Sequence, residues 1–231
     1  MRSEIITALN RARRERRAAI VISDLSEGVQ EILLEGDAIM SSAIAGEVER
    51  RFGSGKSGTA EIDGREFFIN VHMPAPKLVI IGAVHISQSL ALISGLAGFD
   101  TVVIDPREAF AAPGRFPGAT IHALWPEEVL LKTPLDAYTA VAVLAHDPKI
   151  DDFPLIEALQ RNCFYVGALG SRKTHAKRVD RLIKAGVAEE AVARIHAPIG
   201  LDIAAANPAE IAVAVMAEII EALRKRKGEF A

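Results

Sequence analysis

The sequence predicts an α/β protein: a doubly wound parallel sheet preceded by a small α+β N-terminal domain. Two observations carry this prediction. From Lys77 onward, continuous apolar runs alternate with helical stretches, as expected of parallel strands that are buried on both faces and joined by helices. The first run leads directly into a glycine turn, Gly82-Ala83-Val84-His85, which is where dinucleotide-binding sheets have theirs. The larger part of the chain is therefore expected to be Rossmann-like.

The first domain is predicted to span residues 1–76. Its helices are expected at 4–17 and 38–52, and its strands at 18–25, 29–34, 58–62 and 66–73. Asp37 stands where it can cap the second helix. The dipeptide Asp63-Gly64 suits the tight turn of a hairpin between the last two strands. Pro74-Ala75-Pro76 is a stiff break and marks the domain boundary.

The second domain is predicted to span residues 77–231. Its strands are expected at 77–81, 101–104, 138–144 and 163–166, with an extended segment at 194–203. Its helices are expected at 86–97, from Pro126, at 152–160, after Arg172, at 187–192 and from Asn207 to about Lys225. The last helix has the strongest start, because Asn207 can cap it, Pro208 fits its first position and Glu210 its third. This alternation predicts a parallel sheet with right-handed crossovers.

The composition is that of an ordinary globular protein. Of the 231 residues, 50% are hydrophobic and 25% are charged, and the net charge is −3. This balance argues against nucleic acid or an anionic membrane as the main partner. The chain begins without the apolar region of a signal peptide, and it has no apolar stretch of the roughly 18 residues that a membrane span needs. The single cysteine, Cys163, cannot form an internal disulfide and is expected to be a buried, inert thiol. We therefore expect a cytoplasmic protein.

Candidate ligand-binding residues follow the ends of four predicted strands. Ligands of open α/β sheets bind beyond the carboxyl ends of the strands, so polar and glycine residues at these ends are the first to consider. The candidates are Gly82, His85, Asp105, Arg107, His146, Asp147, Gly170, Ser171 and Arg172.

The glycine turn departs from a complete dinucleotide fingerprint. That fingerprint has glycine at the position of Val84, and glycine or alanine at the position of Ser87. A valine side chain is expected to keep a pyrophosphate away from the backbone, so the turn supports NAD(P) binding only weakly. Asp105 follows Gly82 by 23 residues (105 − 82), the spacing of a ribose-binding acid, although a plain turn aspartate fits equally well. Arg107 could instead meet a phosphate.

The other two strand ends carry a His-Asp pair and a basic helix start. His146-Asp147 can supply a base, a ligand or a plain strand-end turn, and no second histidine stands at metal-ligand spacing, so no metal site is predicted. Gly170-Ser171-Arg172-Lys173 combines N–H groups, a hydroxyl and two cations at a helix start. We predict an anion site there, with a solvated basic first turn as the alternative. Gly55-Lys56-Ser57 resembles the end of a P-loop, but Arg50 stands where that motif needs glycine.

The string of motifs from Leu78 to Leu223 resembles the XdhC/CoxF family, the accessory factors of molybdenum hydroxylases such as xanthine dehydrogenase. The matching segments are LVIIGAVHISQSLA, TVVIDPREAFA, RFP, AHD, YVGALGSRK and IHAPIGLDIAAANPAEIAVAVMAEII, the last of which adds Asp202 to the candidate residues. The resemblance implies a non-catalytic chaperone that binds the molybdenum cofactor (molybdopterin). It also implies two partners: a cysteine desulfurase, with which the cofactor is sulfurated, and the molybdenum hydroxylase apo-enzyme that receives it.

Three departures from the family pattern leave alternatives open. The family usually has glycine at 84 and threonine at 145, where this chain has Val84 and Ala145, and the stretch 40–49 lacks the cysteine of a family N-terminal segment. One alternative is an NAD(P)-dependent oxidoreductase, indicated by Gly82 and Asp105 at fingerprint spacing. The other is a regulatory subunit without a ligand, indicated by the departures themselves. The apolar face of the last helix fits either the domain's own core or a homodimer.

Overall fold

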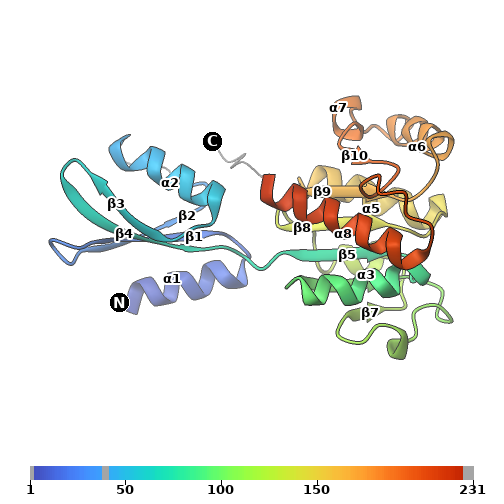
Figure 1. Cartoon of the computed structure of the whole chain (residues 1–231), viewed down its shortest axis with the longest axis horizontal. Helices are drawn as coiled ribbons and strands as arrows, with labels where there is room; N and C mark the ends of the chain where they lie inside the picture. The colour runs from blue at the N-terminus through green and yellow to red at the C-terminus, as the bar shows by residue number, and fades with distance from the viewer. Residues whose placement is uncertain (1–2, 38–41, 226–231) are drawn as a thin grey trace. The chain divides into compact units, whose positions relative to one another are not determined.

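The computed structural model of the chain describes residues 3–37 and 42–225 (Figure 1). By its internal contacts the chain divides into two compact units, one that ends at Pro74 and one that spans Ala75–Lys225. Each unit is described by itself. Among the described residues, no helix has both the length and the apolar character that a bilayer crossing requires.

The N-terminal unit is a four-stranded antiparallel sheet in the order β2-β1-β4-β3. Its elements are α1 (Ser3–Arg14), β1 (Ala19–Asp24), β2 (Gln30–Leu34), α2 (Ser42–Ser54), β3 (Gly58–Ile62) and β4 (Arg65–His72). Asp63 and Gly64 join β3 to β4 with φ angles of 52° and 75°, and a type I′ turn needs positive φ at both central residues. The predicted hairpin is therefore confirmed.

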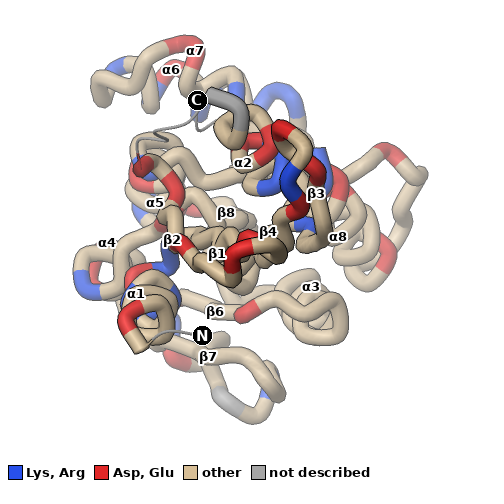
Figure 2. Tube along the Cα trace, turned by 90° about the vertical axis from the view of Figure 1, so that its left-hand side faces the viewer, with Lys and Arg blue, Asp and Glu red and all other residues tan. Residues whose placement is uncertain are grey.

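Strand β1 is the central apolar strand of this unit, and its side chains alternate between two cores. Ala19 and Val21 pack with Ile5 and Leu9 of α1. The opposite face is packed by Ile20, Ile22, Phe67 and Ile69 together with Val48 of α2. The two helices therefore cover opposite faces of the sheet, as Figure 1 shows. In α1, Glu4 lies in the first turn and Arg11, Arg13 and Arg14 lie in the last turn, and charged residues of both signs are coloured along the trace of this helix in Figure 2.

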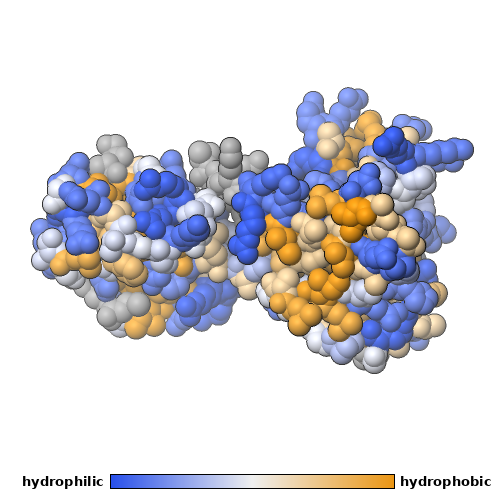
Figure 3. Space-filling model, viewed as in Figure 1, coloured by the Kyte–Doolittle hydropathy of each residue, from blue (hydrophilic) through white to orange (hydrophobic). Residues whose placement is uncertain are grey.

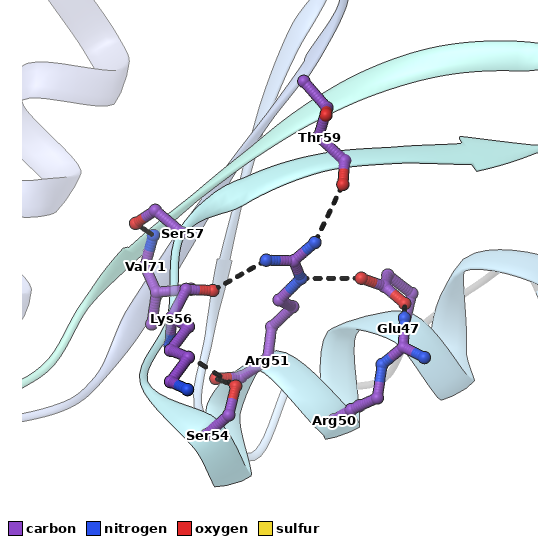
Figure 4. A network of polar contacts seen from close by, with 8 residues as sticks. All are labelled: Glu47, Arg50, Arg51, Ser54, Lys56, Ser57, Thr59 and Val71. Atoms are coloured by element: carbon purple, nitrogen blue, oxygen red, sulfur yellow. Dashed lines mark hydrogen bonds and ion pairs between the residues drawn. The ribbon is translucent and has the colours of Figure 1, made fainter.

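Arg51 ties the end of α2 to the segment that follows it (Figure 4). Its guanidinium donates to the carboxylate of Glu47 (2.6 Å) and to the carbonyl oxygens of Lys56 (3.0 Å) and Thr59 (2.9 Å). The hydroxyl of Ser57 accepts a hydrogen bond from the backbone N–H of Val71 at 2.9 Å. Gly55-Lys56-Ser57 is thus a connection between α2 and β3, and its polar groups bind within the protein.

The predicted cap of the second helix lies partly outside the described residues, because the structure describes α2 only from Ser42. Asp37 itself is described, and its carboxylate accepts a hydrogen bond from the backbone N–H of Leu34 at 3.0 Å. It therefore closes the turn after β2.

The second unit contains a six-stranded, fully parallel sheet in the order β10-β9-β8-β5-β6-β7. Its strands are β5 (Lys77–Ile81), β6 (Asp100–Ile104), β7 (Thr120–His122), β8 (Thr139–Val143), β9 (Tyr165–Ala168) and β10 (Ile195–His196). Counted along the chain within this unit, the order is 3-2-1-4-5-6, which is that of dinucleotide-binding Rossmann folds. The predicted fold class is confirmed.

Helices cover both faces of this sheet. They are α3 (His85–Leu96), α4 (Pro126–Leu130), α5 (Pro148–Gln160), α6 (Arg172–Lys184), α7 (Glu189–Val192) and α8 (Pro208–Lys225), and Pro113–Arg115 form a 3₁₀ turn. Leu78 and Ile80 of β5 face the core under α3 and α8, whereas Val79 and Ile81 face the core under α4, α5 and α6. A strand buried on both faces explains why KLVII is apolar without alternation.

Most element bounds differ from the prediction by a few residues, and four differences in the second unit affect the sheet or the candidate site. Strand β7 is not predicted, because its three residues, TIH, carry no continuous apolar run. Helix α5 begins at Pro148 instead of 152, since Asp147 caps it and a proline fits the first turn. Strand β9 spans Tyr165–Ala168 instead of 163–166. Only Ile195 and His196 of the extended segment pair with the sheet.

Candidate functional site

The candidate site lies where β5 and β8 meet at the carboxyl edge of the parallel sheet. These neighbours lead into helices on opposite faces, α3 and α5, and such a switch point is where open α/β sheets bind ligands. Gly82, directly after β5, has φ +101°, and a Cβ atom there would lie 2.7 Å from the backbone nitrogen of Ala145. Glycine at 82 is therefore needed for the two strand ends to approach each other.

The start of α3 carries no side-chain cap. Val84 occupies the cap position in an extended conformation (φ −86°, ψ 179°) without a capping hydrogen bond. The hydroxyl of Ser87 is buried and donates to the carbonyl oxygen of Gly82, so it stabilises the turn itself. His85 is the first helical residue and is exposed. An uncapped helix start presents free N–H groups and the positive end of the helix dipole, which together favour an anion.

Asp105, at the end of β6, is fully buried and has its hydrogen bonds supplied by the protein. One carboxylate oxygen accepts from the backbone N–H (2.9 Å) and Nε (2.8 Å) of Arg107, and the other from the N–H of Ala83 (2.7 Å) and Nη2 of Arg107 (2.7 Å). Burial alone would raise the pKa of Asp105, but these bonds hold it below its usual value. This geometry leaves no free acceptor for a ribose hydroxyl and favours a structural role.

Arg107 closes over Asp105 and stays partly exposed. Its guanidinium carbon lies 4.5 Å from the centroid of the Phe110 ring, a cation–π distance. The hydrogen bonds to Asp105 and the nearby charges of Asp147 and Asp151 raise its pKa. Arg107, which follows β6, thus lies near the acidic residues at the start of α5. It remains a candidate for contact with an anionic ligand.

His146 and Asp147 form the turn between β8 and α5. His146 has φ +63°, an uncommon conformation for a residue with a side chain, and is exposed. Its pKa lies below the usual value because of desolvation and the nearby Arg178 guanidinium. The carboxylate of Asp147 caps α5 by accepting a hydrogen bond from the N–H of Lys149 at 3.0 Å. Burial and Arg178 therefore favour the neutral form of the His146 imidazole, and Asp147 caps α5.

The start of α6 follows β9 and has the geometry expected of a helix start with a polar cap. Ser171 is the capping residue, and its hydroxyl accepts a hydrogen bond from the N–H of Thr174 at 3.2 Å. Gly170 has φ +136°, and a Cβ atom there would lie 3.2 Å from the side chain of Thr174. Arg172 and Lys173 are exposed. Basic residues are unfavourable at the positive end of a helix unless an anion is present, which is the reason to consider an anion site here.

A buried polar cluster beneath this helix start is not predicted by the sequence pattern. Arg178 of α6 and Asp151 of α5 are each 2% exposed, and their closest N–O distance is 4.0 Å. Nη2 of Arg178 donates to the carbonyl oxygen of Leu169 at 2.9 Å. Nδ1 of His175 is also buried, and in the described part of the chain it has no hydrogen-bond partner. The sequence signal for Arg178 is its position four residues before the buried Leu182 on the same helix face.

Asp202 lies apart from these groups in the loop between β10 and α8. It is exposed, and its carboxylate accepts a 3.4 Å hydrogen bond from the N–H of Ala204. The same loop is fixed by the carboxylate of Glu218, which accepts from the Tyr165 hydroxyl (2.6 Å) and the Gly200 N–H (2.8 Å). The structure therefore links Asp202 to the sheet through its loop, and among the described residues its side chain makes no hydrogen bond or ion pair with the other candidates.

The parallel sheet thus gathers the candidates from four strand ends on one edge. Among residues 3–37 and 42–225, no group of three or more His, Cys, Asp or Glu side chains could hold a metal ion. Cys163 is buried and reduced, and burial raises its pKa to about 12, so the thiol is unreactive as a nucleophile. The candidate site offers helix starts, histidines and arginines, which suit an anionic organic ligand.

Comparison with known proteins gives matches over the same region. The sequence profile of the XdhC Rossmann domain matches residues 78–219. A Bacillus subtilis protein named as a probable xanthine dehydrogenase subunit is 33% identical over 160 residues, which are 69% of this chain and 46% of that protein. The molybdenum cofactor insertion chaperone PaoD of Escherichia coli is 29% identical over 147 residues, which are 63% of this chain and 40% of that protein.

YqeB, an uncharacterized protein of Escherichia coli, is 36% identical over 174 residues, or 70% of this chain and 30% of that protein. The chain therefore spans less than half the length of these three relatives. A crystal structure described as a xanthine dehydrogenase from Bacillus halodurans superposes with a TM-score of 0.66 at 22% identity, covering 97% of this chain and 65% of that one. This likeness shows a shared fold.

Proposed function

The chain belongs to the XdhC family, and on that premise we propose that it is an accessory protein for a molybdenum hydroxylase such as xanthine dehydrogenase. In this proposal it binds the molybdenum cofactor, assists its sulfuration and inserts it into the apo-enzyme, without catalysing a reaction on its own. The observation that carries the proposal is the family match over residues 78–219, which contain every candidate site residue. A relative named as a molybdenum cofactor insertion chaperone supports it.

The residues at the carboxyl edge of the parallel sheet suit the molybdenum cofactor as a ligand. A molybdopterin combines a flat, polar ring system with a phosphate group. The uncapped start of α3 and the basic start of α6 both offer N–H donors to anionic oxygens. His85 and His146 are both exposed and offer imidazoles for hydrogen bonds to a polar ring system. The candidate residues His85, His146 and Arg172 are exposed, and a carrier gains from fast dissociation of its ligand.

A nicotinamide-dependent oxidoreductase is the second candidate, favoured by the 3-2-1-4-5-6 strand order and the uncapped start of α3. Two details argue against it. The position of Val84 carries a side chain where a pyrophosphate normally approaches the backbone, and the oxygens of Asp105 accept four hydrogen bonds from the protein. Fluorescence titration with NADH and NADPH separates the two functions, since saturable binding of either would favour the oxidoreductase.

The test of the main proposal is a titration of the purified protein with molybdenum cofactor. We expect binding at micromolar concentrations, and we expect Arg172→Ala and His146→Ala each to weaken it about fivefold or more through loss of a charged or polar contact. Lys177→Ala, an exposed cation farther along α6, is the matched control and should bind like the wild type. Absence of binding, while another XdhC protein binds under the same conditions, would refute the proposal.

Protein partners are part of the proposal: the apo-enzyme, a cysteine desulfurase, and a second copy of the chain in a homodimer. Apolar side chains gather over α3 and α8 on the face shown in Figure 3. The exposed apolar residues of these two helices are Leu92 and Leu96 of α3 and Val213 and Ile220 of α8. An exposed apolar area of this kind is typical of a protein-binding surface. Co-purification with each partner, and sedimentation of the chain alone, test these assignments separately.

A further inference from the structure

The most unusual group in the molecule is the buried guanidinium of Arg178. Its side chain is 2% exposed and lies directly under the loop before α6, where a Cβ atom at Gly170 would be 3.9 Å from Nη2. Nη2 donates to the carbonyl oxygen of Leu169, but Nε and Nη1 have no hydrogen-bond partner in the described part of the chain. A buried cation with two unpaired donor nitrogens is strongly disfavoured unless something else balances its charge.

The protein itself balances this charge poorly. Asp151 is the nearest carboxylate, but it stays 4.0 Å from Nη2, and its Oδ1 likewise has no partner among the described residues. Burial raises the pKa of Asp151 to about 7, more than Arg178 lowers it, so the carboxyl is only partly ionised at neutral pH. The surplus positive charge also contributes to the lowered pKa of His146 and of His175. The region beneath the start of α6 is therefore electropositive.

We propose that Arg178 and the start of α6 together form an oxyanion site for the phosphate group of a bound ligand, and that Asp151 is an internal anion that opposes its binding. The backbone N–H groups at Arg172 and Lys173 contact the phosphate oxygens. Arg178 acts from below as a positioning residue: it holds the Leu169 carbonyl and supplies a fixed positive charge. The identity of the ligand rests on the proposed function, whereas the site itself is defined by phosphate chemistry.

Two independent features support this assignment. The first is the basic start of a 13-residue helix with Arg172 and Lys173 in its first turn, which is unfavourable without an anion. The second is the buried, incompletely paired guanidinium beneath it. Each feature is destabilising in the absence of a ligand, and one phosphate would offset both. The position after β9, at the carboxyl edge of the parallel sheet, is also where ligands bind in this fold.

The experiment is a titration of the full-length protein with inorganic phosphate at pH 7.5, followed by ³¹P NMR or calorimetry. We expect Arg178→Met to weaken binding about tenfold and Asp151→Asn to tighten it about threefold, since the first removes a nearby positive charge and the second a nearby negative one. Arg181→Met is the matched control. Arg181 lies on the same helix but makes a bidentate pair with Asp152 (2.7 and 2.8 Å), and its loss should change phosphate affinity less than twofold.

The opposite signs of the two effects distinguish this proposal from a purely structural role. A pair that only stabilises the fold would weaken binding on loss of either partner, and that result would overturn the proposal. If Arg178→Met does not fold, Arg178→Gln and Asp151→Asn remain, and a failure of Asp151→Asn to tighten binding overturns the proposal as well. Phosphate binding with these signs but no binding of molybdenum cofactor would leave the subsite standing and refute the proposed function. Cofactor binding that is unaffected by Arg178→Gln would refute the subsite and leave the proposed function standing.

Discussion

Replacing Asp151 by asparagine should change how the stability of the second unit depends on pH. The carboxyl is 2% exposed, and burial raises its pKa to about 7 from the ordinary value of 3.8, although Arg178 opposes the shift. The charges that act on it come from Arg178 and Arg181 of α6, from Asp147 and Asp152 of α5, and from Arg107 of the β6 end. The folded protein thus binds the carboxyl proton of Asp151 more tightly than the unfolded chain does. The stabilisation of the fold that this proton provides is complete below pH 3.8 and is lost as the pH rises through 7.

The size of the effect follows from the two pKa values of Asp151. They differ by about 3, and each unit corresponds to about 1.4 kcal/mol. The full change in the free energy of unfolding is therefore about 4 kcal/mol, of which about 3 kcal/mol falls between pH 5 and pH 8.5. Asparagine does not titrate in this range. The variant should gain about 3 kcal/mol relative to the wild type over that interval, whatever their difference at pH 5.

Urea denaturation at several pH values measures this difference. Trp125 is the only tryptophan of the chain and lies in the second unit, so its fluorescence reports the unfolding of the unit that contains Asp151. Ile150→Val, a buried apolar change next to Asp151, is the control and should lose about 1 kcal/mol equally at every pH. A difference between Asp151→Asn and the wild type that changes by less than about 1 kcal/mol would refute the reasoning.

Three further predictions concern packing and reactivity in the same unit. Gly82→Ala should lose about 3 kcal/mol, because its φ is +101° and the new Cβ would collide with the backbone of Ala145; a loss below 1 kcal/mol in urea melts would contradict this. Glu218→Ala should cost about 3 kcal/mol by leaving the buried Tyr165 hydroxyl without its acceptor, and an unchanged melting curve would argue otherwise. Cys163, whose pKa burial raises to about 12, should resist iodoacetamide at pH 8 until urea is added; rapid labelling of the native protein would show that the thiol is accessible.

The sequence predicts the fold well because the strands of the second unit are buried on both faces. KLVII and TAVAV are apolar after their first residue, and short continuous apolar runs between helices are typical of parallel strands buried on both faces. The apolar pattern does not predict strand β7, since this strand has only three residues on the edge of the sheet and none of them is fully buried. The start of α5 lies earlier than the apolar pattern predicts, because Pro148 reads equally well as a turn residue and as the first residue of a helix.

The sequence predicts the position of the candidate site better than it predicts the contacts of the side chains there. The strand ends are visible in the sequence, and parallel pairing brings them to one edge. The partners of each side chain are not visible. Nothing in the sequence shows that the Arg107 guanidinium would donate hydrogen bonds to both carboxylate oxygens of Asp105. The sequence also does not show that Arg178 would be buried in a helix where most other charged residues are exposed. Such assignments depend on three-dimensional packing between segments that are distant in sequence.

The turn after β5 has a consequence for how proteins of this kind diverge. A Cβ atom at position 82 would collide with the backbone of Ala145, so glycine should be retained at 82 whatever residue stands at 145. Val84 has an ordinary extended conformation that any residue adopts, and its side chain packs against the core. A lineage can therefore replace the fingerprint glycine at position 84 while the sheet stays intact. Such a replacement changes how a ligand approaches the backbone. Within four residues, one position preserves the architecture and another is free to alter what the protein binds.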